Sequence, residues 1–418
     1  MKSPLPTLPL CLLLAWLLAP HSLWARVLLA SPERGLGVTM AAALPGDTVR
    51  VAAGVYREDS VRVSCRLSLL AERGAVLDGI GGGHMLLVHA DSVLITGLTL
   101  RNTTASYRSD YAAILAENCT GLEIRDCVLE QTFFGIYLAR CTGARITGNR
   151  IEANFSSETL SGNGIHLWHC RAPRIAGNAI RGHRDGIYFE FVDSSQICAN
   201  DSHDNLRYGL HFMFSNDDDY MTNRFGSNGA GVAVMFSRRI TMRENNFAHN
   251  WGTAAYGLLL KEIYDGWIYR NDFYHNTTGI FSEGSNRILF TENQFRRNGW
   301  GVKIAGGCEA NNYLHNKFEL NTFDVTMPQN QSSIAFAYNY WDDYEGYDID
   351  HDGIGDIPFR PVKLYGYVVS RTPEAIILLR SFLVDLLNYA EKVSPVATPI
   401  QIQDPSPVMR FEFQNLAP

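Results

Sequence analysis

Two methionines and a histidine in the middle of the chain have side chains suited to binding a soft metal ion. Met213 and Met235 stand 22 residues apart, and His211 lies two residues before the first of them. Thioether sulfur together with imidazole nitrogen is a ligand set that suits Cu(I). These side chains can share one ion only if the fold brings both methionines together. The site therefore depends on a structural repeat whose period equals the spacing of the two methionines.

A second set of candidate ligands lies in an acidic segment near the C-terminus. Asp348, Asp350 and Asp352 stand at alternate positions, and a glycine follows them. Alternating aspartates followed by glycine form the first half of an EF-hand-type Ca²⁺ loop. The twelfth position of this loop is Phe359 where an EF-hand has a bidentate Glu. The segment therefore fits either a weak structural Ca²⁺ site, with Asp356 as a further ligand, or a hydrogen-bonded acidic turn that caps the fold.

The elements that must position these residues are repeats of about 22 residues. A Gly-aliphatic motif recurs at spacings of 29, 22, 23, 22, 26, 22 and 22 residues, and asparagines recur in step with it. Each repeat holds short runs with the two-residue alternation of strands and lacks the 3.6-residue period of helices. Two motifs with one period indicate a solenoid. We therefore predict an all-β fold, a right-handed parallel β-helix whose coils each contribute three short strands. The Gly motifs begin at Gly135, Gly164, Gly186, Gly209, Gly231, Gly257, Gly279 and Gly301.

Aligning the coils on these glycines arranges the side chains in columns. Alternate positions are consistently apolar and point inward, so the residues between them face outward. One outward column contains His211, and the next contains Glu190, Met213 and Met235. Three interpretations fit the methionines: a Cu(I) site, a contact surface for a partner protein, or plain packing. Our candidates for partner contact are Glu190, together with Met221 and Met242 farther round the same coils.

The other histidines and cysteines give weaker signals. His166 and His169 should point to opposite faces of one strand, so we do not combine them with Cys170 into a metal site. Cys119 and Cys141 recur with Cys170 at corresponding places in successive repeats. This pattern predicts a buried ladder of thiols.

The ends of the chain suggest export and a capped solenoid. Residues 1–25 have an early Lys and an apolar stretch, which is typical of a secretory signal peptide. We expect the β-helix over residues 26–335 and an aromatic, Asp-rich capping region over 336–371. We expect an amphipathic helix and an extended tail over 372–418, with the helix itself at 373–391. A net charge of −7 without a basic run argues against nucleic acid as a partner.

Three further segments carry a resemblance to a known family. They are the opening ALPGDTVRV (43–51), RRNGWGVKIAGGCEANNYLHNKFELNTFDV (296–325) and NYWDDYEGYDIDHDGIGDIPFRPV (339–362). With the repeated coils and the apolar C-terminal helix, they make the chain similar to the NosD family over essentially the whole mature length. The resemblance implies a non-enzymatic periplasmic protein that handles copper, as Cu(I), while the copper sites of nitrous oxide reductase are built. It also implies an ABC-type ATPase, its membrane permease and a copper chaperone lipoprotein as partners, through which the chain is associated with the inner membrane.

A secreted polysaccharide lyase, hydrolase or epimerase is the alternative class. Such an enzyme needs acids and a base gathered along one outer sheet. The available groups are scattered along the sequence, and the Asp217–Asp219 triplet fits a solvated loop. The Asp-Pro-His motif of alginate-type epimerases is absent from the sequence. A passive scaffold or adhesin is a third interpretation. The other candidate groups for an enzyme are His183, Arg184, Asp185 and Glu190.

Overall fold

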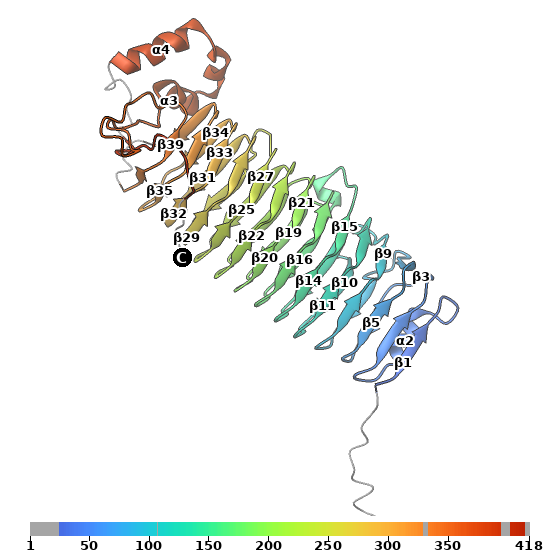
Figure 1. Cartoon of the computed structure of the whole chain (residues 1–418). Coiled ribbons are helices and arrows are strands. Elements are labelled where there is room, and N and C mark those ends of the chain that lie inside the picture. The colour runs from blue at the N-terminus through green and yellow to red at the C-terminus, as the bar shows by residue number, and fades with distance from the viewer. Residues whose placement is uncertain (1–24, 107, 329–332, 394–401, 414–418) are drawn as a thin grey trace, which may run out of the picture.

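The computed structural model describes residues 25–106, 108–328, 333–393 and 402–413. Almost all of the expected signal peptide (residues 1–25) lies outside the described residues. The chain winds into a long parallel solenoid (Figure 1), which confirms the predicted parallel β-helix. Each coil contributes one strand to each of three sheets, here named A, B and C in the order in which the chain visits them. The strands continue to Trp341, six residues beyond the predicted end of the solenoid.

Sheets A and B form two faces of the solenoid. Sheet A consists of β1 (Val27–Ala30), β2 (Thr48–Val51), β5 (Ser68–Ala71), β8 (Leu94–Thr96), β11 (Glu123–Arg125), β14 (Arg145–Thr147), β17 (Arg174–Ala176), β20 (Gln196–Cys198), β23 (Asp219–Met221), β26 (Thr241–Arg243), β29 (Tyr264–Tyr269), β32 (Asn286–Thr291), β35 (Asn312–Leu314) and β38 (Ala335–Ala337). Sheet B consists of β3 (Gly54–Arg57), β6 (Ala75–Asp78), β9 (Thr99–Arg101), β12 (Val128–Glu130), β15 (Arg150–Glu152), β18 (Ala179–Arg181), β21 (Asp201–His203), β24 (Arg224–Gly226), β27 (Asn246–Ala248), β30 (Asp272–Tyr274), β33 (Gln294–Arg296), β36 (Lys317–Glu319) and β39 (Tyr340–Trp341).

Sheet C carries the Gly motifs and the candidate ligands of the middle coils. It consists of β4 (Val61–Val63), β7 (Leu86–Val88), β10 (Ala112–Glu117), β13 (Phe134–Ala139), β16 (Ile165–Trp168), β19 (Asp185–Glu190), β22 (Tyr208–Met213), β25 (Ala230–Met235), β28 (Leu258–Lys261), β31 (Thr278–Glu283), β34 (Trp300–Ile304) and β37 (Phe323–Thr326). The motif needs glycine because the interior is full at that position. A Cβ on Gly209 would come within 2.7 Å of the Asn228 amide nitrogen.

The asparagines form two hydrogen-bonded ladders inside the corners. In the first ladder, Asn223 donates from its backbone N–H and from Nδ2 to Oδ1 of Asn245, at 2.9 and 3.0 Å. Asn245 donates in the same way to Asn271. Because these amides are hydrogen-bonded from coil to coil and buried, apart from the half-buried Asn321, the ladders fix the height and register of the coils that carry them. The first ladder runs through Asn149, Asn178, Asn200, Asn223, Asn245, Asn271, Asn293, Asn316 and Asn339, and the second through Asn205, Asn228, Asn250, Asn276, Asn298 and Asn321.

Helices close both ends of the solenoid. At the N-terminal end, α2 (Leu36–Ala41) begins with its backbone N–H groups on the Glu58 carboxylate, at 2.7 Å. At the other end, α3 (Leu364–Arg371) packs on β37, where Tyr365 and Val369 contact Phe323 and Val384. Figure 1 shows these C-terminal helices standing beyond the last coils. None of the helices among the described residues is long and apolar enough to cross a membrane.

The C-terminal part differs from the single amphipathic helix that we predicted over 373–391. The helical segment is broken into a 3-10 helix, η2 (Pro373–Leu378), and α4 (Phe382–Val393). The break falls at Arg380, whose φ of 69° is left-handed and cannot continue a helix. The tail beyond it is not simply extended, because residues 402–413 return to the solenoid. There the Asp404 carboxylate accepts hydrogen bonds from Asn339 and Trp341, each at 3.0 Å, and so ends the first ladder.

We expect Asn245→Ala to lower the free energy of unfolding by about 3 kcal/mol or more. The substitution leaves two buried donors of Asn223 without an acceptor, and such groups cost about 1–3 kcal/mol each. Chemical denaturation measures this loss. Asn246→Ala is the matched control, because Asn246 is half-buried and its side-chain amide donates to the neighbouring Asp272 on the outer face. Equal losses in both variants would mean that the ladder is not a major source of stability.

A buried carboxyl group makes the stability depend on pH. Asp218 is 2% exposed, and its Oδ1 accepts hydrogen bonds from the backbone and hydroxyl of Ser195. The triplet is therefore not the solvated loop that the sequence suggested. Burial raises the pKa of Asp218 to about 7 from 3.8. The folded protein thus holds this proton in a pH range where the unfolded chain has lost it.

We expect the stability difference between the wild type and Asp218→Asn to shift against the wild type as the pH rises from about 4 to 7. The sign follows because a raised carboxyl pKa favours folding only while the group is protonated. Each pKa unit corresponds to about 1.4 kcal/mol, so the change is on the order of a few kcal/mol. Denaturation curves of both proteins at a series of pH values measure it. A difference that stays constant over this range contradicts the assignment.

Candidate functional site

Met213 and Met235 lie side by side on the outer face of sheet C, as the repeat period predicts. Their strands β22 and β25 pair in parallel with Met213 opposite Met235. Both side chains are half-buried. In the same column, Glu190 pairs with Met213 on one side and Lys261 pairs with Met235 on the other. The two thioether side chains thus project from neighbouring strands, which lie about 4.8 Å apart, and are bordered by a carboxylate and an ammonium group.

His211 occupies the outer face of β22, two residues before Met213, but it is covered. It is 5% exposed, which differs from the open position that its outward column suggested. The rings of Tyr188 and Tyr208 lie against it, with centroids at 5.2 and 4.8 Å. Neither ring nitrogen of His211 has a hydrogen-bond partner among the described residues. A buried imidazole without partners is costly and is free to accept a ligand.

A buried carboxylate stands beside this imidazole. Asp185 is fully buried, and its Oδ2 lies 3.8 Å from Nδ1 of His211. The Arg184 guanidinium is at a similar distance, 3.7 Å, from the same oxygen. A carboxylate next to Nδ1 orients an imidazole so that its other nitrogen is presented to a ligand. Simple alternation along β19 does not predict this neighbour, because Gly186 faces inward and shifts the alternation between Asp185 and the rest of the strand.

The other predicted partner residues do not join this group. Met242 is 1% exposed and points into the core from the centre of β26, so it cannot form an outer contact surface. Its neighbours in β26, Thr241 and Arg243, are half-buried, so the alternation of the strand places Met242 inside. Met221 is half-buried on the outer face of sheet A, around the corner from sheet C. Of the three partner candidates, Glu190 alone shares the column of the methionines.

His166, His169 and Cys170 are separated, as the sequence analysis expected. His166 lies between the rings of Tyr137 and Tyr188, and burial, followed by the charge of Arg184, lowers its pKa to about 3. His169 stands exposed at the corner after β16. The thiol of Cys170 is buried and donates to backbone carbonyls at 3.5 Å. These three residues do not converge on one point.

The three recurring cysteines form the predicted buried ladder. Thr142 and Arg171 bond the carbonyls of Cys119 and Cys141, so these cysteines occupy one column with Cys170. Each is 3% exposed or less. A hydrogen bond from the Cys119 thiol to Cys141, followed by burial, raises the pKa of Cys119. All three thiols lie in the core of the solenoid, so the ladder serves packing.

The groups that a polysaccharide enzyme would use remain dispersed. His183 is fully buried and stands in the second ladder, where its backbone N–H donates to Asn205. Asp217 and Asp219 pair with Arg239 and Arg243 on the outer surface. No open cluster of acids and a base arises from these residues among the described parts of the chain.

The acidic segment near the C-terminus forms a tight turn. Oxygen atoms of Asp348, Asp350 and Asp352 lie within 4.8 Å of one another. Repulsion from Asp352, followed by a smaller effect of burial, raises the pKa of Asp350. Asp356 is not part of this trio, because its Oδ2 accepts the backbone N–H of Ile349 at 2.7 Å. The structure thus brings three of the four predicted oxygen ligands together.

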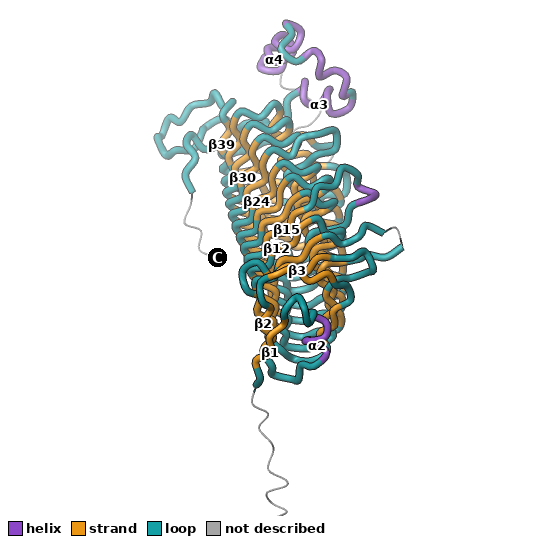
Figure 2. The backbone as a smooth tube through the Cα atoms, turned by 90° about the vertical axis from the view of Figure 1, so that its right-hand side faces the viewer, coloured by secondary structure: helices purple, strands orange, loops and turns teal. Residues whose placement is uncertain are grey.

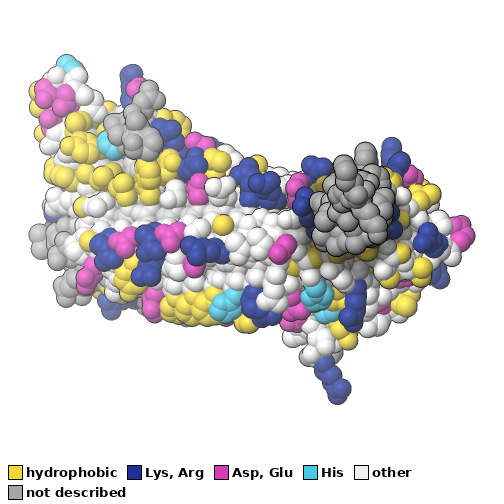
Figure 3. Space-filling model, turned by 90° about the horizontal axis from the view of Figure 1, so that it is seen from below, with side chains coloured by type: hydrophobic (Ala, Val, Ile, Leu, Met, Phe, Trp, Pro, Cys, Tyr) yellow, Lys and Arg dark blue, Asp and Glu magenta, His cyan; other side chains and the backbone are white. Residues whose placement is uncertain are grey.

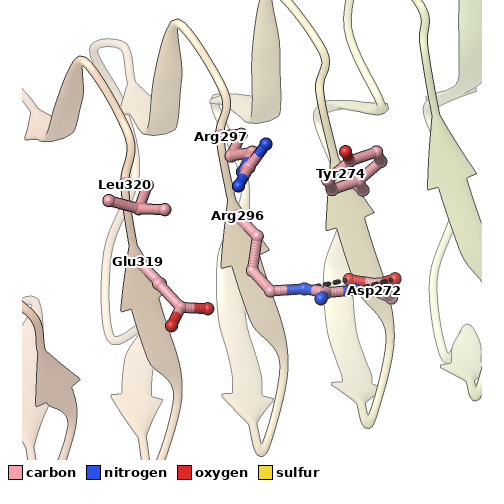
Figure 4. Close-up of a pocket in the computed structure, with 6 residues that line it drawn as sticks. All are labelled: Asp272, Tyr274, Arg296, Arg297, Glu319 and Leu320. Carbon is pink, nitrogen blue, oxygen red and sulfur yellow. Dashed lines mark hydrogen bonds and ion pairs between the residues drawn. The ribbon is translucent and has the colours of Figure 1, made fainter.

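Two hollows lie on the surface near this end. A groove of about 910 Å³ separates the acidic turn from the returning segment 408–413, and the stacked rings of His315 and Tyr338 line it. A smaller pocket of about 430 Å³ lies on sheet B (Figure 4). There the Arg296 guanidinium donates to both carboxylate oxygens of Asp272, at 3.1 and 2.7 Å. This pair links neighbouring coils and explains the charges of the smaller pocket without a ligand.

The fold and the site together define a parallel β-helix protein with an imidazole and two thioethers on the outer face of one sheet. The family model described as periplasmic copper-binding protein (NosD) matches residues 154–347, and that of the right-handed β-helix region matches residues 84–218. A probable ABC transporter binding protein NosD from Pseudomonas aeruginosa is 30% identical over 380 residues, 86% of this chain and 88% of that protein. Its counterpart from Stutzerimonas stutzeri is 27% identical over 387 residues, 88% of each chain. The chain belongs to the NosD family.

Solved structures share the fold alone. The Dettilon tailspike protein has a TM-score of 0.54 at 11% identity, covering 72% of this chain and 65% of that one. A mannuronan C-5 epimerase A-module from Azotobacter vinelandii has a TM-score of 0.41 at 16% identity, covering 72% and 87%. Parallel β-helices serve unrelated activities, so function must come from the outer surface.

Proposed function

We propose that this chain is a non-catalytic periplasmic protein that accepts and releases Cu(I) while the copper sites of nitrous oxide reductase are assembled. The observation that carries this proposal is the register that sets Met213 opposite Met235, with His211 on the same strand face. Family membership supports it, since the matching family is described as periplasmic and copper-binding.

The donor set suits transient binding of Cu(I). Residues two apart on a strand are about 6.7 Å apart, and paired strands about 4.8 Å, so the three side chains can converge on one ion. Thioether sulfur is a soft ligand that favours Cu(I) over the harder divalent ions, and imidazole is a common copper ligand. Two of the donors are half-buried at the surface, which lets the ion leave without unfolding of the coil. Asp185 would act as a positioning residue that holds the ring of His211.

The C-terminal helices offer a surface for a membrane-embedded partner. Ile377 and Phe382 are 86% and 81% exposed, and Tyr389 on α4 is 66% exposed. Large apolar side chains that lie exposed close together mark interaction surfaces. The relatives are named ABC transporter binding proteins. We propose that this face docks on the permease of an ABC-type transporter, while the solenoid projects into the periplasm towards a copper chaperone and the reductase.

The proposed copper site and the helical face lie on one side of the molecule. Both α3 and the methionines are attached to sheet C, the former at β37 and the latter at β22 and β25. Four strand steps separate β25 from β37, which is about 19 Å. A conformational change in a permease docked on the C-terminal helices would therefore act on one end of sheet C, the sheet to which the methionines belong.

We expect the purified mature protein to bind Cu(I) in an anaerobic titration against a competing chelator. The variant Met213→Leu/Met235→Leu should bind at least about tenfold more weakly, because it loses both thioethers while nearly keeping the packed volume. Met221→Leu is the matched control, since Met221 is equally half-buried but lies on sheet A. Unchanged affinity in the double variant would move the copper ligands elsewhere. The absence of Cu(I) binding by the wild type would refute the proposal.

We also propose that the acidic turn binds a structural Ca²⁺ ion. The observation is the convergence of three carboxylates, in which repulsion from Asp352 raises the pKa of Asp350. Carboxylate oxygens are the ligands that Ca²⁺ prefers. The turn packs against the returning segment through an antiparallel bridge between Ile354 and Val408, so an ion here would stiffen the cap of the solenoid.

We expect Ca²⁺ to raise the melting temperature of the metal-free protein by a few degrees. A ligand that binds the folded state alone stabilises it in proportion to the logarithm of its concentration. Asp350→Asn should abolish the rise, whereas Asp343→Asn, an exposed carboxylate before the turn, should keep it. Differential scanning calorimetry with Ca²⁺, and with Mg²⁺ for comparison, measures the effect. If Asp350→Asn responds to Ca²⁺ as the wild type does, the turn is held by its hydrogen bonds alone.

A further inference from the structure

Three exposed phenylalanines form a stacked row at the corner between sheets C and A. Phe191, Phe214 and Phe236 stack with ring centroids 5.1 Å apart at each step and interplanar angles of 12°. Each ring is 38–40% exposed. The imidazole of His169 extends the row, stacked on Phe191 at 4.5 Å. We call these four residues the aromatic ladder.

The backbone of this corner does not require aromatic side chains. In the coils from β10 to β31, the residue that directly follows the sheet C strand has a left-handed φ of 50–58°, a conformation that bulky side chains disfavour. The coils on either side use polar residues or glycine in the same conformation. Aromatic rings therefore carry a cost at this position, both in backbone strain and in exposed apolar surface. The corner residues in order are Asn118, Arg140, His169, Phe191, Phe214, Phe236, Glu262 and Gly284.

The aromatic ladder borders the proposed copper site. Phe214 directly follows Met213, and Phe236 directly follows Met235, so the sequence Met-Phe-Ser occurs at both places. The serine of each is inward and holds the corner, with the hydroxyl of Ser237 accepting the backbone N–H of Ser215 at 3.1 Å. The phenylalanines thus extend the surface of the thioethers around the edge of sheet C. Figure 3 shows hydrophobic side chains gathered in rows along the solenoid.

This corner is also open to a large partner. The longer coils carry their extra residues at the corner between sheets B and C, as in the loop with η1 (Glu158–Leu160) and the loop with Trp251. Figure 2 shows such loops projecting together from one side of the solenoid. At the corner of the aromatic ladder the chain turns tightly in every coil from β10 to β31. The rings therefore form a stacked edge that stays exposed beside the tight turns of this corner.

From these observations we infer that the aromatic ladder is the docking surface of a protein that exchanges Cu(I) with Met213 and Met235. This inference rests on the proposed copper function. Direct exchange requires the two metal sites to approach within bonding distance, and an interface that surrounds them must exclude water. An apolar centre of aromatic rings with a charged rim has the composition of such an interface. The Asp217–Arg239 ion pair supplies part of that rim, because these residues follow closely after Phe214 and Phe236.

The partner chemistry follows from the position of the rings. Two of the three phenylalanines directly follow the proposed copper ligands Met213 and Met235, and the third follows Glu190 in the same column, so the apolar surface lies beside the metal donors. We therefore assign the occupant as a copper-carrying protein that presents Cu(I) at an apolar surface. A second copy of this chain or an apolar surface unrelated to copper is an alternative that the experiment tests.

The test compares Cu(I) transfer from two donors. One donor is the Cu(I)-loaded soluble domain of a periplasmic copper chaperone of the nitrous oxide reductase system, and the other is a small-molecule Cu(I) chelate. The variant is Phe191→Asn/Phe214→Asn/Phe236→Asn, because Asn118 occupies the same corner conformation in an earlier coil. We expect transfer from the chaperone to slow at least about tenfold and transfer from the chelate to stay unchanged.

The control and the opposite outcomes separate this inference from the copper proposal. Leu320→Asn also removes an exposed apolar side chain with a left-handed backbone, but at another corner, and should leave both transfers unchanged. Equal transfer from the chaperone in the triple variant and the wild type overturns the docking surface, and so does a triple variant that loses transfer from both donors. If the wild type takes Cu(I) from neither donor, the copper proposal itself fails. Binding of the metal-free chaperone, measured by calorimetry, then still tests the surface, and self-association of the chain that the substitutions abolish would assign it to a second copy.

Discussion

The structure depends on one interaction above all, the hydrogen bonding of stacked asparagine amides in two of its corners. Each amide uses its donors and its acceptor on the coils above and below, as Asn245 does with Asn223 and Asn271. A coil that slipped by one residue would leave several of these buried groups unsatisfied, at a cost that a domain of ordinary stability cannot bear. The register of the sheets is therefore fixed, and every outer residue has a defined neighbour one coil away.

Because the register is fixed, residues that stand one period apart in the sequence become neighbours on the surface. Two methionines separated by one full period become neighbours on sheet C without any dedicated loop, and so do the aromatic rings beside them. The core needs only the inward positions, which hold stacked rings such as Phe247 and Phe273. The outward positions are thus free to carry a metal site or an interface while the fold stays the same. This separation explains how one architecture serves unrelated activities.

The sequence allowed the fold and the pairing of the methionines to be predicted, because both follow from the period alone. It did not allow the burial of His211 to be predicted, since the cover comes from Tyr188 and Tyr208 on neighbouring strands. Met242 was misplaced because its position in the coil was not compared with the inward alternation of β26. Asp404 could not be found at all. It reaches the ladder from a segment without a repeat, 65 residues after Asn339.

The returning C-terminal segment links the acidic turn to the last coil of the solenoid, next to the helices that we propose as the docking surface. Asp404 holds the last ladder amide and the Trp341 indole, and the bridges to Ile354 and Phe359 clamp the acidic turn on the same end. The helices that precede this segment expose apolar side chains and pack on the final strand of sheet C. A partner bound to the helices would therefore displace this end of the solenoid. Because each coil contacts only its neighbours, the hydrogen bonds between stacked coils would transmit the displacement along the solenoid. In the proposed function, the solenoid thus connects the helices that would dock on the transporter with the methionine pair several coils away.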